Sequence, residues 1–325
     1  MNRPEEKSLG LPGDRVLAFT DSGNATSSTV VIFFHGAFGV GDASRPSPVI
    51  LNKNLHFITP TLPGWGNSSP IDHAVDYVSV FASDITALIT HLHPDDSTLR
   101  LYICGGSFGT VHAQILHGLS YDVFPLGRHI IGLLLLAPLS PPHCHKDYAK
   151  GLTWPNYFMV GPPARHIPFN CVAHLGKLAI GRKMGSAAVA EVFIRETLFD
   201  QMDEGELESY AKWRSMRGLE DGQLQREMAE NVVRSVAKTW DGYFSIPEIY
   251  HSGWGGVCPD KLDDEHAHRP VLIVASRADH LAPAYMADWL AKNYRNAKLK
   301  FIEGGHIAAI FHLDEIWDEF LSLEA

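Results

Sequence analysis

The stretch LYICGGSFGTVHA, residues 101–113, carries one serine, Ser107, between Gly105 and Gly109 and directly behind an apolar run. The apolar run predicts a buried strand, and the residues after the serine predict a helix. Glycine at both flanking positions permits a sharp turn between the two elements. This order of strand, serine turn and helix is expected of a nucleophile elbow, in which the turn exposes a reactive hydroxyl. Taken alone, the stretch is also compatible with an ordinary turn.

Short apolar runs and helical patterns alternate along the rest of the chain. The pattern of apolar residues also predicts a helix over Asp76–Leu92. Because the apolar runs are nearly continuous, they are typical of parallel strands buried on both faces. The alternation predicts an α/β fold with a mostly parallel central sheet flanked by helices. The predicted strands are 29–35, 56–60, 100–104, 130–137, 271–276 and 297–302.

The alternation stops after Pro138, and residues 139–269 contain no convincing buried strand. A segment of this length is too long for a plain loop. We therefore expect an α/β core at 1–138 and 270–325, with a large helical cap, 139–269, inserted between two core strands. Within the cap the sequence predicts a helix capped by Ser186, a helix opened by acidic residues and ending near Trp213, and a helix over 224–243. The acidic residues are Asp203, Glu204 and Glu206.

Composition excludes several classes of protein. The chain has 325 residues, 45% of them hydrophobic and 20% charged, which is ordinary for a globular protein. A formal net charge of −10 without a basic run argues against nucleic acid as a partner. No stretch is long and apolar enough for a signal or membrane anchor. The four cysteines are scattered singly, which indicates neither a disulfide framework nor a zinc site and favours a reducing, cytoplasmic location. They are Cys104, Cys144, Cys171 and Cys258.

A serine hydroxyl is a poor nucleophile unless a histidine base and a carboxylate assist it. Two later segments offer these groups in the loops that follow predicted strands. VLIVASRADHLAP, 271–283, places Asp279 after one strand, and AKLKFIEGGHIAAI, 297–310, places His306 after the next. Asp279 could also cap the helix that follows it. His280 and His312 are the other candidate bases, but their positions beside the acid and further along the next helix are less suitable.

These motifs together resemble the α/β-hydrolase fold superfamily, whose catalytic residues follow the order serine, acid, histidine. FFHGAFG, 33–39, and PGWGNS, 63–68, resemble two further motifs of that family. The resemblance covers the core and is weak over the cap. It implies an oxyanion hole made by the backbone N–H groups of Ala37 and Phe108. It also implies that His35 organises the loop rather than acting as a base.

The resemblance implies a serine hydrolase, similar to esterases and lipases, that acts on a small and apolar substrate with Ser107, Asp279 and His306 as its catalytic residues. No cofactor is expected. Histidine pairs at 143–145 and 266–268 lack the spacing of a strong metal site, so no metal is expected either. Aromatic residues could line an acyl pocket or form the core of the cap. The candidates for substrate binding are Phe38, Trp154, Tyr157, Phe158 and Trp213.

Three other functions stay open at this point. GGSFG resembles the elbow of proline iminopeptidases, although HGAFG and TLPGWGNSS depart from that family's usual motifs. Such an aminopeptidase would need cap carboxylates facing the site, and Glu191, Glu196, Asp203 and Glu204 are available. Hydrolysis of a carbon–carbon bond is a second alternative, and a receptor-like fold with little turnover is a third. Nothing in the pattern predicts the oligomeric state.

Overall fold

A computed structural model of the chain describes residues 4–166 and 171–323. Its eight strands form one sheet in the order β1-β2-β4-β3-β5-β6-β7-β8. The six strands from β4 to β8 run parallel, and β1 and β2 join the β4 edge in antiparallel pairs. The mostly parallel sheet predicted from the sequence is therefore confirmed. The bounds are β1 Lys7–Leu11, β2 Arg15–Gly23, β3 Thr29–Phe34, β4 His56–Pro60, β5 Arg100–Gly106, β6 Ile130–Leu136, β7 Val271–Ser276 and β8 Ala297–Ile302.

All six predicted strands are present, as β3 to β8, with ends within two residues of the prediction. The antiparallel strands β1 and β2 were not predicted. β1, KSLGL, is exposed at most of its positions, so it lacks the apolar signal that marks the central strands. Edge strands face water on one side and are short and polar in many proteins, which makes them hard to recognise from hydrophobicity.

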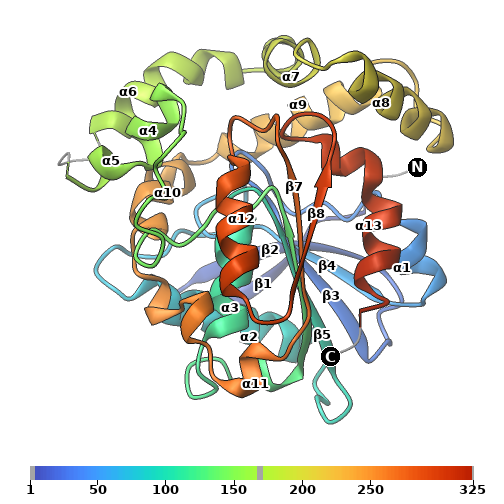
Figure 1. Cartoon of the computed structure of the whole chain (residues 1–325). Coiled ribbons are helices and arrows are strands. Elements are labelled where there is room, and N and C mark those ends of the chain that lie inside the picture. Colours follow the sequence, from blue (N-terminus) through green and yellow to red (C-terminus); the bar gives the residue numbers. More distant parts are fainter. Residues whose placement is uncertain (1–3, 167–170, 324–325) are drawn as a thin grey trace.

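Helices cover both faces of the sheet, giving three layers (Figure 1). Side chains alternate between the faces along each strand. On one face, residues such as Val31 and Leu134 pack against α1 (Pro48–Asn52) and α13 (Leu313–Phe320). On the other face, neighbours such as Ile32 and Leu133 share a core with helices α2, α3 and α12. These helices span Tyr77–Leu92, Gly109–Gly118 and Ala284–Asn293.

The predicted helix at 76–92 is confirmed as α2. Its N-cap is Asp76, whose side chain accepts a hydrogen bond from the backbone N–H of Ser79 at 3.0 Å. Such a cap satisfies one of the free donors at a helix start. Buried residues Phe81, Ile85 and Leu88 lie three to four positions apart and face the sheet. An apolar stripe thus packs α2 against the sheet, and the Asp76 side chain caps its N-terminus.

The long segment between β6 and β7 is helical in the part that the structure describes. None of its described residues belongs to a strand. In Figure 1 the helices α4 to α9 of this insertion lie across the top, over one end of the sheet. The division into a core and a separate cap domain stays a prediction. The insertion helices are α4 Trp154–Val160, α5 Pro162–His166, α6 Cys171–Ile180, α7 Ala187–Ile194, α8 Glu204–Met216, α9 Gln223–Val236, α10 Asp241–Tyr250 and α11 Asp264–Ala267.

Two helix starts in the insertion were predicted correctly. Ser186 caps α7, and Asp203 caps α8 by accepting a hydrogen bond from the N–H of Glu206 at 2.9 Å. The predicted helix over 224–243 was wrong, because this range holds α9 and the start of α10 with a break between them. At the break, the hydroxyl of Thr239 accepts a hydrogen bond from the N–H of Asp241, a local contact that competes with a continuous helix.

No helix in the described ranges has both the length and the apolar character needed to cross a bilayer.

The cysteines contradict the sequence analysis at one pair. Cys144 and Cys258, which are 114 residues apart, form a disulfide, whereas Cys104 and Cys171 are free. The pairing depends on the fold bringing the start of the insertion beside its end, which isolated cysteines in a sequence do not reveal. Disulfides are typical of oxidising compartments, so the predicted cytoplasmic location loses the support it took from the cysteines.

Candidate active site

Ser107 lies on the turn between β5 and α3, and its backbone has the left-handed φ of 51°. This conformation is costly for a residue with a side chain, and it is typical of strained turns at functional sites. The turn also brings backbone segments close together. A Cβ atom at Gly109 would lie 2.2 Å from the carbonyl oxygen of Phe34, and one at Gly105 would lie 2.4 Å from the carbonyl oxygen of Gly109. The turn therefore needs glycine at both positions.

Ser107, His306 and Asp279 form one hydrogen-bonded chain. The Oγ atom of Ser107 lies 3.0 Å from Nε2 of His306, and Nδ1 of the same ring lies 2.7 Å from Oδ2 of Asp279. The carboxylate is the acceptor, so Nδ1 carries the proton and Nε2 is free to accept the proton of the serine hydroxyl. The His306 side chain is 14% exposed, whereas that of Asp279 is 1% exposed. The arrangement can activate a nucleophile at a partly open surface.

Asp279 is held in place by its second carboxylate oxygen. Oδ1 accepts hydrogen bonds from the N–H groups of Leu281 at 2.8 Å and Ala282 at 2.9 Å. α12 itself begins at Ala284 with Pro283 at its N-cap position, so Asp279 stabilises the turn that leads to the helix rather than capping it. The local structural role and the contact with the histidine are thus carried by different oxygens of one carboxylate.

The other candidate bases lie elsewhere. His280 is exposed beside the acid, and His312 lies 4.0 Å from Glu315. Within the described residues, His306 is the histidine that contacts Ser107.

The proposed oxyanion donors lie on two neighbouring loops. Phe108 is the N-cap residue of α3, and Ala37 lies in the exposed turn after β3. In the described ranges neither backbone N–H donates a hydrogen bond to another part of the protein. A Cβ atom at Gly36 would lie 3.1 Å from Cβ of Ser107, so the turn after β3 passes directly beside the serine. Free N–H groups beside a nucleophile suit the binding of a developing negative charge.

His35 is buried, and its imidazole ring is uncharged at neutral pH. Its Nε2 atom accepts a hydrogen bond from the N–H of Leu62 at 2.9 Å, and Nδ1 donates to the carbonyl of Gly36 at 2.7 Å. Burial lowers the pKa of His35 from 6.5 to about 4, despite the opposing effect of the Gly36 carbonyl. The ring therefore ties the loop after β3 to the loop after β4.

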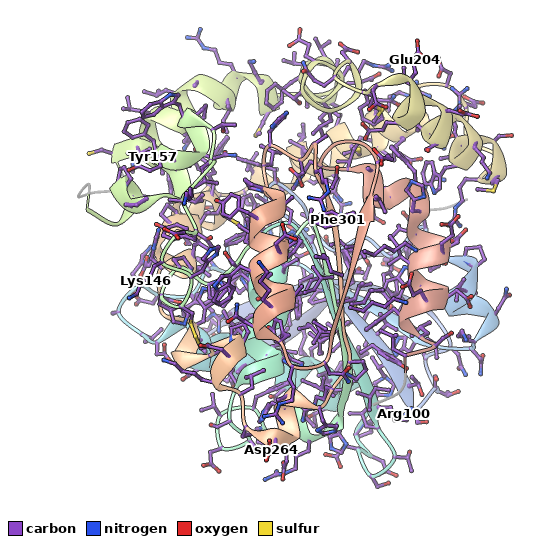
Figure 2. The ribbon with its side chains drawn as sticks, in the orientation of Figure 1. Arg100, Lys146, Tyr157, Glu204, Asp264 and Phe301 are labelled. Atoms are coloured by element: carbon purple, nitrogen blue, oxygen red, sulfur yellow. A yellow bond between two sulfur atoms is a disulfide. The ribbon has the colours of Figure 1, made fainter. Side chains whose placement is uncertain are left out.

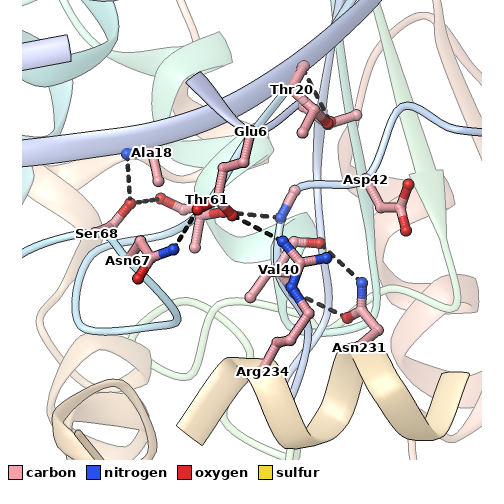
Figure 3. Close-up of polar contacts among 12 residues, drawn as sticks. Glu6, Ala18, Thr20, Val40, Asp42, Thr61, Asn67, Ser68, Asn231 and Arg234 are labelled. Atoms are coloured by element: carbon pink, nitrogen blue, oxygen red, sulfur yellow. Dashed lines mark hydrogen bonds and ion pairs between the residues drawn. The ribbon is translucent and has the colours of Figure 1, made fainter. Parts of the chain in front are cut away.

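The insertion also holds the loop that contains Ala37. Asn231 of α9 accepts a hydrogen bond from the N–H of Val40 at 2.9 Å and donates to the carbonyl of Val40 at 3.4 Å (Figure 3). Nearby, Arg234 of the same helix pairs with Glu6 at 2.9 Å. The sequence analysis did not identify Asn231, because a polar residue on an amphipathic helix carries no sign of what it contacts.

Thr110 is a second residue that the sequence analysis missed. Its hydroxyl donates to the carbonyl of Ser107 at 2.6 Å and accepts from the N–H of Leu139 at 3.1 Å. Gln114, one turn further along α3, donates to the carbonyl of Leu139 at 2.9 Å. The helix after the serine thus fixes the first residues of the insertion. Only the position of Thr110 three residues after Ser107 could have suggested this role.

The five residues predicted to bind substrate lie in three places. Phe38 contacts the rings of Trp65, Trp240 and Tyr243, with ring centroids 5.2 to 6.2 Å apart. Trp213 is 5% exposed and packs in a separate buried cluster of the insertion, against Phe311.

The other three lie together on α4. Trp154, Tyr157 and Phe158 contact one another, and Trp154 is 75% exposed (Tyr157 is labelled in Figure 2). Of the five, Phe38 is next to a predicted oxyanion donor in the sequence. A role in binding for the rest stays a prediction.

The carboxylates that an aminopeptidase would need have other surroundings. Glu191 pairs with Arg195 at 2.7 Å, and Asp203 caps α8. Glu196 and Glu204 are exposed, and Glu204, labelled in Figure 2, is the first residue of α8. In the described ranges none of the four contacts the side chain of Ser107, His306 or Asp279.

One group of potential metal ligands lies away from this site. His143, Cys144 and Cys258 place their ligand atoms within 4.8 Å of one another, but the two sulfur atoms are bonded to each other. In the second histidine pair, Nδ1 of His266 contacts Asp263 at 2.7 Å and its Nε2 contacts the Leu119 carbonyl at 3.0 Å.

Comparison with known proteins identifies relatives of the fold. A family model described as the alpha/beta hydrolase family matches residues 31–322. No curated protein matches in sequence. A solved structure of a hydrolase from Pseudomonas aeruginosa is similar, with a TM-score of 0.60, 12% identity and coverage of 98% of this chain and 99% of that chain. An esterase from Thermogutta terrifontis is similar with a TM-score of 0.57, 18% identity and coverage of 99% and 98%. An esterase from Exiguobacterium antarcticum is similar with a TM-score of 0.56, 14% identity and coverage of 98% of both chains.

Proposed function

This chain belongs to the alpha/beta hydrolase family, and we propose that it is a serine hydrolase that cleaves a carboxylic ester through an acyl-enzyme on Ser107. The observation that carries the proposal is the hydrogen-bonded chain from the Ser107 hydroxyl through the His306 ring to the Asp279 carboxylate. Two of the similar solved structures are described as esterases, which favours an ester as the substrate. The proposed reaction uses no cofactor.

In the first half of the reaction, Oγ of Ser107 attacks the ester carbonyl while Nε2 of His306 takes the hydroxyl proton. Asp279 keeps the proton of the ring on Nδ1 and stabilises the imidazolium that forms. The carbonyl oxygen gains negative charge as the tetrahedral intermediate forms. The N–H groups of Ala37 and Phe108 are proposed to bind it, and one such donor is typically worth about 3 kcal/mol of barrier.

In the second half, the intermediate collapses and the bond from the carbonyl carbon to the alcohol oxygen breaks. His306 gives its proton to the departing alcohol, which leaves an acyl group on Ser107. A water molecule then attacks the acyl carbon while His306 again takes a proton. The second tetrahedral intermediate releases the carboxylic acid and returns the proton to Ser107.

The proposed substrate is small and apolar because aromatic rings lie next to the proposed oxyanion loop. Phe38 follows Ala37 directly and packs edge-on against Trp65 and Trp240. Burial raises the pKa of the neighbouring Tyr243 to about 12, so this phenol is neutral at physiological pH. A wall built mainly of aromatic rings favours an apolar acyl or alcohol group.

The test combines covalent labelling with turnover. A fluorophosphonate probe should label the folded wild-type protein, and Ser107→Ala should abolish both labelling and hydrolysis of p-nitrophenyl esters. Ser120→Ala, which changes an exposed serine just beyond the far end of α3, is the matched control and should leave both unchanged. Failure of the folded wild type to react with the probe would overturn the proposal. Faster cleavage of prolyl arylamides than of every ester in the series would replace it with an aminopeptidase.

A further inference from the structure

Glu206 connects the insertion to the loop that carries His306. It lies in the first turn of α8, yet its side chain points into the protein and the residue is only 4% exposed. Its Oε2 atom accepts a hydrogen bond from the backbone N–H of Gly305 at 2.9 Å. Gly305 directly precedes His306 in the chain. A buried carboxylate of the insertion therefore lies one peptide away from the proposed catalytic base.

The loop is shaped to receive this carboxylate. Gly304 has a φ of 104°, a conformation that favours glycine, and a Cβ atom there would lie 2.6 Å from Cδ of Glu206. At Gly305 the nearest approach of a Cβ atom would be 3.7 Å, to Oε2 of the same side chain. Glycine at position 304 thus leaves room for the carboxylate, whereas a Cβ atom at position 305 would only make an ordinary van der Waals contact with it. Any side chain at position 304 would displace it.

The same peptide is held from its other side by the core. The hydroxyl of Ser276, at the end of β7, donates a hydrogen bond to the carbonyl of Gly304 and accepts one from the N–H of Ala278 at 3.1 Å. Ser276 therefore ties the loop of His306 to the loop of Asp279. Glu206 thus bonds the N–H of this peptide, and Ser276 bonds its carbonyl. Of the two, only Glu206 comes from the insertion.

The Glu206 carboxylate has few other hydrogen-bond partners. In the described ranges its other oxygen, Oε1, is buried without a hydrogen-bond partner. Burial raises the pKa of Glu206, the Gly305 N–H opposes that rise, and the nearby Asp203 adds to it. A buried carboxylate with a single hydrogen-bond partner costs folding free energy, so a role in holding the loop explains its position better than a role in stability.

We propose that Glu206 is a positioning residue for His306, fixing the 304–305 peptide so that the ring reaches Asp279 and Ser107 together. The inference rests on the proposed function. It makes the reactivity of Ser107 depend on the contact between Glu206 and the Gly305 N–H, because this contact is one of the two anchors of the peptide. A small displacement of a reacting group is enough to lower a rate by about 10²-fold.

Three variants separate this role from a general contribution to stability. Glu206→Ala removes the acceptor for the Gly305 N–H. Glu206→Gln keeps an oxygen acceptor in the same place. Arg217→Ala, at the other end of α8, removes the 2.7 Å ion pair with Asp314 and so weakens the same docking without touching the loop of His306. If the alanine variant at 206 does not fold, Glu206→Met fills the space without supplying an acceptor.

The measurements are the rate of fluorophosphonate labelling of Ser107, kcat and KM for a p-nitrophenyl ester, the kinetic pKa of the base and the melting temperature. We expect Glu206→Ala to slow labelling and kcat by about 10- to 100-fold with KM nearly unchanged and the kinetic pKa shifted. Glu206→Gln should restore most of the rate, and Arg217→Ala should lower the melting temperature while leaving the rate close to that of the wild type.

Two outcomes would overturn the inference. One is a folded Glu206→Ala or Glu206→Met protein that labels at the wild-type rate. The other is an equal loss of rate in Glu206→Gln and Arg217→Ala, which would mean that docking alone matters. A wild-type protein that does not label at all contradicts the proposed serine hydrolase instead, so the two failures are distinguishable.

Discussion

Asp279 contacts His306 with one carboxylate oxygen and its own loop with the other. Oδ2 lies 2.7 Å from Nδ1 of the ring, while Oδ1 accepts the N–H groups of Leu281 and Ala282. Chemistry and local folding can therefore be separated by substitution at this single position.

Asp279→Asn is expected to keep the loop and lose the reaction. The amide oxygen can still accept the two N–H groups, whereas the amide nitrogen would donate to Nδ1 and force the proton of His306 onto Nε2. In that tautomer the ring cannot take the Ser107 proton, so kcat should fall by about 10⁴-fold. Asp279→Ala should lose activity as well and also melt at a lower temperature. Steady-state rates and thermal unfolding of both variants test this, and full activity in a folded Asp279→Asn protein contradicts it.

Asn231→Leu is expected to weaken the binding of the transition state through the oxyanion loop. Without the side-chain amide, Val40 loses both hydrogen bonds to α9, and the nearby N–H of Ala37 is less firmly placed. We expect a loss in kcat of up to about 10²-fold. The inhibition constant of a boronic acid, which forms a tetrahedral adduct on a serine, should rise in parallel. Glu227→Gln, which alters an exposed ion pair of α9 with Arg45, is the control and should change neither quantity.

Gly109→Ala is expected to destabilise the turn at Ser107. The added methyl group would lie 2.2 Å from the carbonyl oxygen of Phe34 and 2.6 Å from that of His35, and backbone atoms cannot move aside easily. The free energy of unfolding should fall by roughly 1–3 kcal/mol. At Gly10 in β1 the same change meets no atom within 4 Å and should cost less than about 0.5 kcal/mol. Denaturant titrations of both variants measure the difference, and equal stabilities would contradict the close packing described for this turn.

His35 predicts how stability depends on pH. Its pKa is about 4 in the folded protein, below the ordinary value of 6.5. Above pH 6.5 the ring is neutral in both states. As the pH falls from 6.5 toward 4, the unfolded chain binds a proton that the folded protein does not, so stability is lost by up to about 1.4 kcal/mol per pH unit.

His35→Gln retains an acceptor for the Leu62 N–H and removes the titrating group. The free energy of unfolding of this variant should therefore fall less steeply between pH 6 and pH 4.5 than that of the wild type. The slopes should differ by up to about 1.4 kcal/mol per pH unit, which corresponds to one proton. Parallel slopes would mean that His35 takes up its proton over the same pH range in the folded protein as in the unfolded chain, which would contradict the lowered pKa.

The disulfide gives a prediction about thiols. The unfolded but unreduced protein should titrate two thiols, Cys104 and Cys171, and four after reduction. Cys144→Ser with Cys258→Ser should lower the free energy of unfolding by about 2–5 kcal/mol, because the crosslink closes a loop with a sequence separation of 114. A reducing agent should do the same to the wild type. Four reactive thiols in the unreduced, unfolded chain would contradict the pairing.

The core of the fold was predictable because its signals are local. Strands such as β6, IIGLLLL, and β7, VLIVAS, are apolar along their whole length, and the loops after the last two strands carry Asp279 and His306. Parallel strands bring such loops to one edge of the sheet, so a hydrogen-bonded chain of Ser107, His306 and Asp279 could be expected from their order alone.

The remaining features depend on contacts between distant segments. At the break between α9 and α10 the hydroxyl of Thr239 bonds the N–H of Asp241, and the disulfide depends on the meeting of the two ends of the insertion. The sequence predicted Glu206 correctly as an acidic residue in the first turn of a helix. Its contact with Gly305 joins distant segments, so the local pattern could not predict it. Likewise, no periodicity distinguishes Trp213 as a core residue of the insertion from a residue lining a pocket.

The place of the insertion in the chain also bears on how the protein is synthesised. Leu133 of β6 pairs with Val271 of β7. The whole insertion between these residues must therefore leave the ribosome before β7 can pair with the free edge of β6. Throughout this interval the nascent chain carries the serine turn without its acid or its base. On the proposed chemistry, an arrested polypeptide that stops short of Val271 is therefore inert toward esters, and catalytic competence comes only with the last two strands and the loops behind them.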